Sequence, residues 1–301
     1  MNNKSNQDRD HINKNIRTDI LTVRPKHRLG QNFLFDEVIL SNIVKACSIE
    51  PHESVLELGS GAGTLTHELA LISDKILGIE IDESLIYFAN KHLSIYPSIS
   101  FMHEDILNIK IDELVESNKI NKEYIAVGNI PYYITQPILQ LLLYARPQPN
   151  RIVLMTQREL ANRIVGGNGK ESFLSLLVQI YGHAYKAFDL PANAFWPIPK
   201  VNSSLIVIDI DKNKNIHSAE ETKNILSVIK VGFSAPRKQI HNVLKMSLDV
   251  DVSKIDSILR KASIEPSLRA QHVPLASWMK LADIFNLELT SILTELREQF
   301  K

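Results

Sequence analysis

Apolar and polar positions follow two alternating patterns between residues 36 and about 210. Short runs rich in β-branched residues are typical of buried strands, and longer stretches with apolar residues every three or four positions are typical of amphipathic helices. Seven strands are predicted, at 54–58, 75–81, 98–103, 124–127, 151–156, 184–190 and 204–210. Helices are predicted at 38–46, 65–72, 85–93, 137–144, 159–165 and 173–180.

This alternation predicts a doubly wound, Rossmann-like α/β sheet of seven parallel strands joined by right-handed crossovers, with helices on both faces. Ligands of such sheets bind at the carboxyl ends of the strands. Beyond residue 211 the apolar spacing, as at 225–233 and 275–285, is helical throughout. We therefore predict an α/β domain over 26–211 and a small all-helical domain over 212–301, with the polar residues 1–25 as a disordered tail.

Charge is distributed unevenly, although the formal net charge is zero. Residues 31–145 contain 6 Lys or Arg against 16 Asp or Glu, whereas residues 146–301 contain 21 against 15. A zero net charge argues against a purely electrostatic nucleic-acid binder, but the uneven distribution is compatible with a small-molecule half beside a half that faces phosphates.

The one cysteine, Cys47, excludes an internal disulfide and a cysteine cluster for a zinc site, so no metal is expected. It lies in a helical apolar pattern, which predicts a buried thiol. No stretch resembles a signal peptide or reaches the ~20 apolar residues that span a bilayer. We expect a cytoplasmic protein with no membrane partner, and nothing in the sequence requires a dimer, so a monomer is expected.

A glycine-rich turn follows the first predicted strand, with Gly59, Gly61 and Gly63 before a helix. Glycines allow the backbone to approach a ligand closely. Thr64 occupies a position where the dinucleotide fingerprint requires glycine, and no Lys-Ser or Lys-Thr pair follows, as a P-loop would require. The turn is therefore suited to a nucleoside without a pyrophosphate, and a nicotinamide oxidoreductase is disfavoured.

Acidic residues follow the next two predicted strands. Glu80 lies about 20 residues after the glycine turn, where a carboxylate binds the hydroxyls of a ribose, and Asp105 follows the third strand, within reach of an adenine amine. Each acid alone is equally compatible with an exposed loop residue. Their regular placement after successive strands favours the site.

The tetrapeptide Asn129, Ile130, Pro131 and Tyr132 follows the fourth strand. The exocyclic amine of adenine is a poor nucleophile because its lone pair is delocalised. The Asn129 side-chain oxygen and the Ile130 carbonyl can accept its hydrogens and direct the lone pair at a methyl sulfonium. Pro131 would fix the turn and Tyr132 would stack on an extruded base. The alternative is a turn in which these residues serve only backbone geometry.

Together these residues, with residues 29–34 (Leu-Gly-Gln-Asn-Phe-Leu), resemble the KsgA/RsmA family of ribosomal RNA adenine dimethyltransferases, which is related to the Erm resistance enzymes. The resemblance covers residues 26–301. It implies a methyltransferase that uses S-adenosylmethionine and dimethylates N6 of two adjacent adenosines in 16S ribosomal RNA during small-subunit assembly. It further implies a cofactor site made of Asn32, Leu34, Gly59, Glu80, Asp105 and Asn129.

The resemblance continues into residues 194–203, a proline-rich loop before the last strand, and into a basic stretch around Arg237 and Lys238. Phe195 in the loop is predicted as a second wall of the target-base pocket, although core packing is an alternative. The expected RNA-binding residues are Arg158, Arg163, Arg237 and Lys238. The chain departs from the family at residues 133–135, Tyr-Ile-Thr in place of Asn-Ile-Ser, and its arginine pair is reduced to Arg237-Lys238.

Two rival functions stay open at this point. One is an Erm-like methylase of the large-subunit RNA, which the loop at 194–203 and the basic stretch disfavour. The other is a non-catalytic ribosome assembly factor, which the intact tetrapeptide at 129–132 disfavours.

Overall fold

The computed structural model describes residues 16, 18–167, 169–214, 218–248 and 251–292. The chain forms two compact units, Met1–Ala161 with Tyr185–Ile210, and Asn162–Ala184 with Asp211–Lys301. The sequence assigned residues 26–211 to one domain, whereas the structure groups Asn162–Ala184 with the second unit. The reason is that α8 (Phe173–Tyr181) packs on α9 (Ala219–Gly232) and α12 (Leu275–Glu288).

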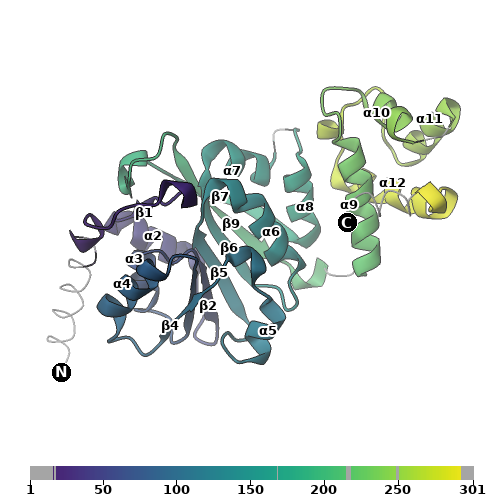
Figure 1. Cartoon of the computed structure of the whole chain (residues 1–301). Coiled ribbons are helices and arrows are strands. Elements are labelled where there is room, and N and C mark those ends of the chain that lie inside the picture. Colours follow the sequence, from purple (N-terminus) through teal and green to yellow (C-terminus); the bar gives the residue numbers. More distant parts are fainter. Residues whose placement is uncertain (1–15, 17, 168, 215–217, 249–250, 293–301) are drawn as a thin grey trace. The chain divides into compact units, whose positions relative to one another are not determined.

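A seven-stranded sheet forms the centre of the α/β fold, and all seven predicted strands are confirmed (Figure 1). The strands are β2 (Ser54–Leu58), β3 (Ile76–Glu80), β4 (Ile99–His103), β5 (Tyr124–Asn129), β6 (Arg151–Gln157), β7 (Gly182–Leu190) and β9 (Ser203–Ile210). Their order is β4-β3-β2-β5-β6-β9-β7. The chain order reverses beside β2, whose neighbours are β3 and β5, and ligands bind at such a switch point.

The prediction that all strands are parallel is wrong. β9 pairs antiparallel with β6, with Leu154 opposite Ile206, whereas β2 to β6 pair in parallel. The twelve residues between β7 and β9 contain no α-helix. A parallel crossover usually requires a helix, so a helix-free connection is compatible with a strand that returns in the opposite direction.

Helices cover both faces of the sheet, with α2, α3 and α4 on one side and α5 and α6 on the other (Figure 1). These helices are α2 (Glu37–Cys47), α3 (Thr64–Leu69), α4 (Glu83–Leu93), α5 (Ile111–Glu116) and α6 (Thr135–Tyr144), and α7 (Arg158–Val165) follows β6. Side-chain N-caps mark the first turns of two of these helices. Asp36 accepts from the Ile39 amide at α2, and Asp82 accepts from the Ser84 amide at α4.

A two-stranded sheet outside the main sheet was not predicted. β1 (Phe33–Leu34) pairs antiparallel with β8 (Phe195–Trp196), so that Leu34 lies opposite Phe195 and Phe33 opposite Trp196. Two-residue strands carry no readable alternation in the sequence. The pairing joins the two family motifs that lie farthest apart in the α/β unit.

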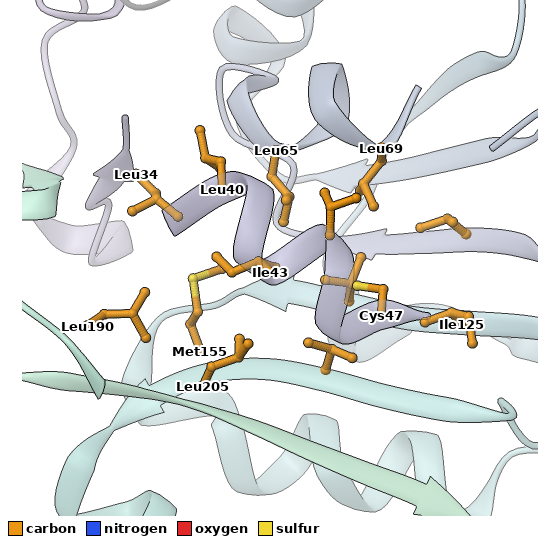
Figure 2. Close-up of a cluster of buried hydrophobic side chains, with 14 of the residues drawn as sticks. Leu34, Leu40, Ile43, Cys47, Leu65, Leu69, Ile125, Met155, Leu190 and Leu205 are labelled. Atoms are coloured by element: carbon orange, nitrogen blue, oxygen red, sulfur yellow. The ribbon is translucent and has the colours of Figure 1, made fainter. Parts of the chain in front are cut away.

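The main apolar cluster lies between α2 and the sheet (Figure 2). Leu40, Ile43 and Cys47 face the sheet from α2, and Met155 and Leu205 face them from β6 and β9. All five side chains are buried, which confirms the prediction for Cys47. Burial raises the pKa of the Cys47 thiol to about 12, so it stays protonated at neutral pH.

The prediction of a disordered tail over 1–25 is wrong for the part that the structure describes. Ile16 and Ile20 are buried, at 1% and 0% exposure. Ile16 packs on Ala89 and Leu93 of α4, and Ile20 packs in a cluster with Phe33. Two isoleucines one helical turn apart supply the apolar surface that the polar composition of the segment concealed. Residues 1–15 and 17 lie outside the described residues.

The second unit is helical over its described residues beyond 211, as predicted. It contains α9, α10 (Ile240–Ser247), α11 (Val252–Lys261) and α12. Gly232, at the end of α9, allows close packing, because a Cβ there would lie 2.1 Å from the Trp278 ring. Within the described residues, no helix combines the length and apolar character required to traverse a lipid bilayer.

Candidate active site

A cavity of about 220 Å³ opens at the carboxyl ends of β2, β3 and β5. Its wall includes every residue predicted to touch the cofactor, from five separate parts of the chain. They are Asn32, Leu34, Gly59, Glu80, Asp105 and Asn129. Folding therefore brings together residues that lie up to 97 positions apart in the sequence.

The glycine turn between β2 and α3 forms the floor of this cavity. Gly59, Gly61 and Gly63 have φ angles of +72°, +56° and +87°, which side chains with a Cβ rarely adopt. The amides of Gly59 and Ser60 donate to the Ile79 carbonyl at 2.9 and 3.1 Å, which ties the turn to the end of β3. A Cβ at Gly59 would lie 3.5 Å from the Asn129 carbonyl oxygen, so the turn also approaches the end of β5 closely.

Glu80 occupies the end of β3 and is 7% exposed. One carboxylate oxygen accepts from the Gly61 amide at 2.8 Å, and the other accepts from the Asp82 amide at 2.9 Å. Burial raises the pKa of Glu80, although the two amide bonds oppose this shift. Glu80 thus holds the glycine turn in place, and its remaining lone pairs are available to a ligand.

Sequence reasoning missed Glu57, a second acid at the cavity wall. Its side chain is 2% exposed, and Oε2 accepts a 2.6 Å hydrogen bond from the Thr66 hydroxyl. Burial raises its pKa to about 8. The available signal was a glutamate between two leucines of a predicted buried strand, just before the glycine turn.

Asn129 ends β5 with its amide group oriented by one contact. Its Nδ2 donates to the Asn32 carbonyl at 2.9 Å, and Asn32 Nδ2 donates to the Gly30 carbonyl at 3.0 Å. The Asn129 Oδ1 and the Ile130 carbonyl accept no hydrogen bond from any residue that the structure describes. Two acceptors at the cavity are therefore available to an amine.

The rest of the tetrapeptide lies at the same edge. Ile130 and Pro131 line the cavity, and Tyr132 begins a 3₁₀ turn over Tyr132–Ile134. The side chain of Tyr132 lies outside the described part of the structure. Tyr133, which replaces the asparagine of the family pattern, lines the cavity as well.

The structure does not place Phe195 at the pocket. Its ring is 1% exposed and packs in the core cluster with Leu34 and Leu190, so the prediction of a base-stacking wall is corrected to core packing. The reason is strand alternation, because neighbouring side chains of β8 point to opposite sides. Phe195 points inward, and Trp196 is the exposed one, at 37%.

The predicted RNA-binding residues are all exposed. Arg158 and Arg163 lie on α7, and Arg237 and Lys238 lie in the loop between α9 and α10. An isolated bridge between Gln239 and Arg269 and a 2.7 Å bond from the Ile240 amide to the Leu268 carbonyl hold that loop. No described carboxylate forms a salt bridge with any of these four cations, although Arg158 interacts electrostatically with Asp189.

Residues 23–287 match the family model described as ribosomal RNA adenine dimethylase. The chain belongs to this family. The ribosomal RNA adenine dimethylases are methyltransferases whose methyl donor is S-adenosylmethionine, so the molecule is an enzyme with that cofactor.

Proteins with similar sequences or structures have names that are consistent with this family. A ribosomal RNA small subunit methyltransferase A of Dehalococcoides mccartyi is 32% identical over 86% of this chain and 88% of its own length. The protein of the same name from Clostridium botulinum is 35% identical over 85% of this chain and 92% of its own. A dimethyladenosine transferase from Plasmodium falciparum shares the fold, with a TM-score of 0.72 and 23% identity over 85% of this chain and 98% of its own.

The cavity suits S-adenosylmethionine. Ser60 Oγ is buried at the cavity wall without a hydrogen-bond partner among the described residues, and a ligand with polar atoms would satisfy it. Glu80 and Asp105 line the cavity with carboxylates, which can accept hydrogen bonds. Their contacts with ribose hydroxyls and with an adenine amine stay predictions of the sequence. The roles of Asn32, Leu34 and Gly59 as direct contacts stay predictions of the resemblance.

Proposed function

We propose that this dimethylase transfers methyl groups to N6 of two adjacent adenosines in 16S ribosomal RNA within an assembling small subunit. The observation that carries the proposal is that two acceptors of residues lining the cofactor cavity, Asn129 Oδ1 and the Ile130 carbonyl, accept no hydrogen bond from a described residue. The choice of the small subunit draws on the two relatives named small subunit methyltransferase A.

The chemistry of this pair of acceptors suits an adenine amine. Each amine hydrogen is donated to one acceptor, Asn129 Oδ1 or the Ile130 carbonyl, and the nitrogen becomes more tetrahedral as its lone pair leaves the ring system. The 2.9 Å bond from Asn129 Nδ2 to the Asn32 carbonyl fixes which end of the amide faces the amine. Preorganised acceptors of this kind act at no reorganisation cost during the reaction.

The bound cofactor supplies an electrophilic methyl group on a sulfonium. No strong general base is required, because the amine proton becomes acidic once the nitrogen carries the new methyl and then leaves to water. Glu57 and Glu80 do not serve as this base in the proposal, since Thr66 and the backbone amides already engage their carboxyl groups.

RNA binding in this proposal involves Arg237 and Lys238 in the helical unit, together with Arg158 and Arg163 on α7. Exposed cations that form no salt bridge with a described carboxylate suit phosphate contacts, which fix position rather than read sequence. Their contribution would appear as a steeper loss of affinity with added salt.

The substrate can be tested by incubating the enzyme and labelled S-adenosylmethionine with isolated small-subunit particles and, separately, with large-subunit RNA. We expect N6-dimethyladenosine only in the small-subunit RNA, located by mass analysis of nuclease fragments. Methylation of the large-subunit RNA alone would reject the proposal in favour of an Erm-like activity. A particle that binds the protein without gaining any methyl group would reject it in favour of a non-catalytic assembly factor.

A further inference from the structure

A second hollow adjoins the cofactor cavity. Gly30, Asn32, Pro131, Tyr133 and Gln157 line it, and all of these except Gln157 also line the cavity. The hollow and the cavity therefore share four wall residues, so a molecule bound in the hollow would lie next to a molecule bound in the cavity.

Tyr133 provides the aromatic surface of the hollow. Its side chain is 68% exposed, in contrast to the buried Phe195. Gly30 packs closely beside the ring, because a Cβ there would lie 3.2 Å from Pro131 Cβ and 3.6 Å from Tyr133 Cε1. The φ of +64° at Gly30 also disfavours any other residue. An exposed ring in the wall of a hollow suits stacking against a nucleobase.

Gln157 provides the polar group of the hollow. It ends β6, two residues after Met155, and side chains two apart in a strand share one face of the sheet. Met155 lines the cofactor cavity, so the same face of β6 leads from the cavity into the hollow. The Gln157 carboxamide has no hydrogen-bond partner among the described residues and offers both a donor and an acceptor.

We propose that this hollow receives the target adenine, that Tyr133 stacks on one face of the base, and that Gln157 Nε2 donates to ring nitrogen N1. This inference rests on the proposed function. N1 neighbours the carbon that bears the amine, and the amine hydrogens remain free for Asn129 Oδ1 and the Ile130 carbonyl.

The stacking role predicts a defined pattern for Tyr133 variants in methyl transfer to small-subunit particles. Tyr133→Ala should lower kcat/KM for the particle roughly 10-fold or more, with the Kd for S-adenosylmethionine within about twofold of wild type in calorimetry. Tyr133→Phe should restore most of the activity, because the ring is retained. Tyr87→Ala is the matched control, since Tyr87 is 75% exposed and lines neither cavity. Equal activity of Tyr133→Ala and Tyr87→Ala would overturn the proposal.

The hydrogen bond can be isolated by combining Gln157→Leu with a particle reconstituted with 1-deazaadenosine at the target position, which lacks the N1 acceptor. Gln157→Leu should lower kcat/KM several-fold on adenosine and leave turnover of the 1-deaza substrate at the wild-type enzyme's level. An equal loss on both substrates would overturn the assigned contact. If the wild-type enzyme methylates no small-subunit RNA, the proposed function has failed. If the wild type is active and the variants match it, only this inference has failed.

Discussion

The Asn129 side-chain amide donates a 2.9 Å hydrogen bond to the backbone carbonyl of Asn32, which lies 97 residues earlier in the chain. This contact joins the segment before β1 to the end of β5. It also orients the side-chain amide of Asn129. Because Nδ2 points toward the Asn32 carbonyl, Oδ1 points away from it. The family motif at residues 29–34 therefore positions the Asn129 side chain in addition to lining the cofactor cavity.

Removal of the Asn129 amide should separate chemistry from cofactor binding. We expect Asn129→Ala to lower kcat by about 100-fold or more, as loss of one preorganised polar group at a reacting centre typically does. The Kd for S-adenosylmethionine should change much less, because the cavity keeps its other lining residues. Single-turnover methylation and calorimetry measure the two effects. Asn90→Ala on the exposed side of α4 serves as the control, and unchanged turnover in Asn129→Ala would contradict the mechanism.

Phe195 should behave as a core residue. We expect Phe195→Ala to lower the free energy of unfolding by about 3–5 kcal/mol, as truncation of a buried phenylalanine does. Trp196→Ala, at the partly exposed neighbouring position, should cost much less. Urea denaturation followed by circular dichroism gives both values. A small effect of Phe195→Ala on stability, with a large one on KM for the particle, would instead restore the base-stacking role.

Glu57 should make stability depend on pH. Its folded-state pKa is about 8, against an ordinary 4.5 in the unfolded chain. The folded state therefore holds the proton more tightly, and its stability falls as the pH rises from about 4.5 to about 8. We expect Glu57→Gln to flatten this slope and to be more stable than wild type at pH 9, since the amide is neutral and its oxygen still accepts from Thr66.

The measurement for Glu57 is the urea midpoint of both proteins at pH 6 and at pH 9. Subtracting the two proteins at each pH removes the contribution of the other titrating groups. Parallel pH dependence of wild type and Glu57→Gln would show that Glu57 is ionised in the folded protein at pH 6.

Asp82 ties the N-terminal segment to α4. It caps the helix by accepting from the Ser84 amide, and it also accepts from Lys26 Nζ at 2.7 Å and from Gln31 Nε2 at 3.1 Å. Desolvation pushes its pKa upward, but the hydrogen bonds from Lys26, Ser84 and Gln31 outweigh it and lower the pKa to about 2. The carboxylate is therefore charged at neutral pH.

We expect Asp82→Ala to cost about 1–2 kcal/mol of stability through the lost cap. Asp82→Asn should cost less, because asparagine also caps helices and because Lys26, at 45% exposure, contributes only a weak ion pair. Urea denaturation of the two variants at pH 7 provides the comparison. Equal losses in both would mean that the charge, rather than the cap, is the main contribution.

The sequence predicted the regular elements of the α/β unit well, because buried strands and amphipathic helices each have a characteristic pattern of apolar residues in the sequence. The predicted bounds of β2 agree with the observed strand Ser54–Leu58, and the predicted bounds of the other six strands differ from the observed ones by at most a few residues. It could not give the direction of β9, because a strand's alternation is the same whichever way it runs. The pairing of β1 with β8 could not be predicted either, since it depends on contacts between residues 161 and 163 positions apart in the chain.

The site was predictable where a motif fixes the backbone, as at the glycine turn and the tetrapeptide. It was less predictable where the outcome depends on which way a side chain points. Phe195 and Trp196 are adjacent aromatics, and only the pairing with β1 decides that Phe195 faces the core. Ile16 and Ile20 were concealed in the same manner, because the surface they cover is created only when α4 folds.

The single cysteine, at the end of α2, is buried against the sheet, and this makes the molecule convenient for spectroscopic labelling. A thiol with a pKa of about 12 and no solvent exposure reacts slowly with maleimides and other alkylating reagents at neutral pH. One cysteine introduced at an exposed position would therefore accept a fluorophore or spin label alone. Distances and motions between the protein and its RNA could then be followed without first removing a native sulfhydryl.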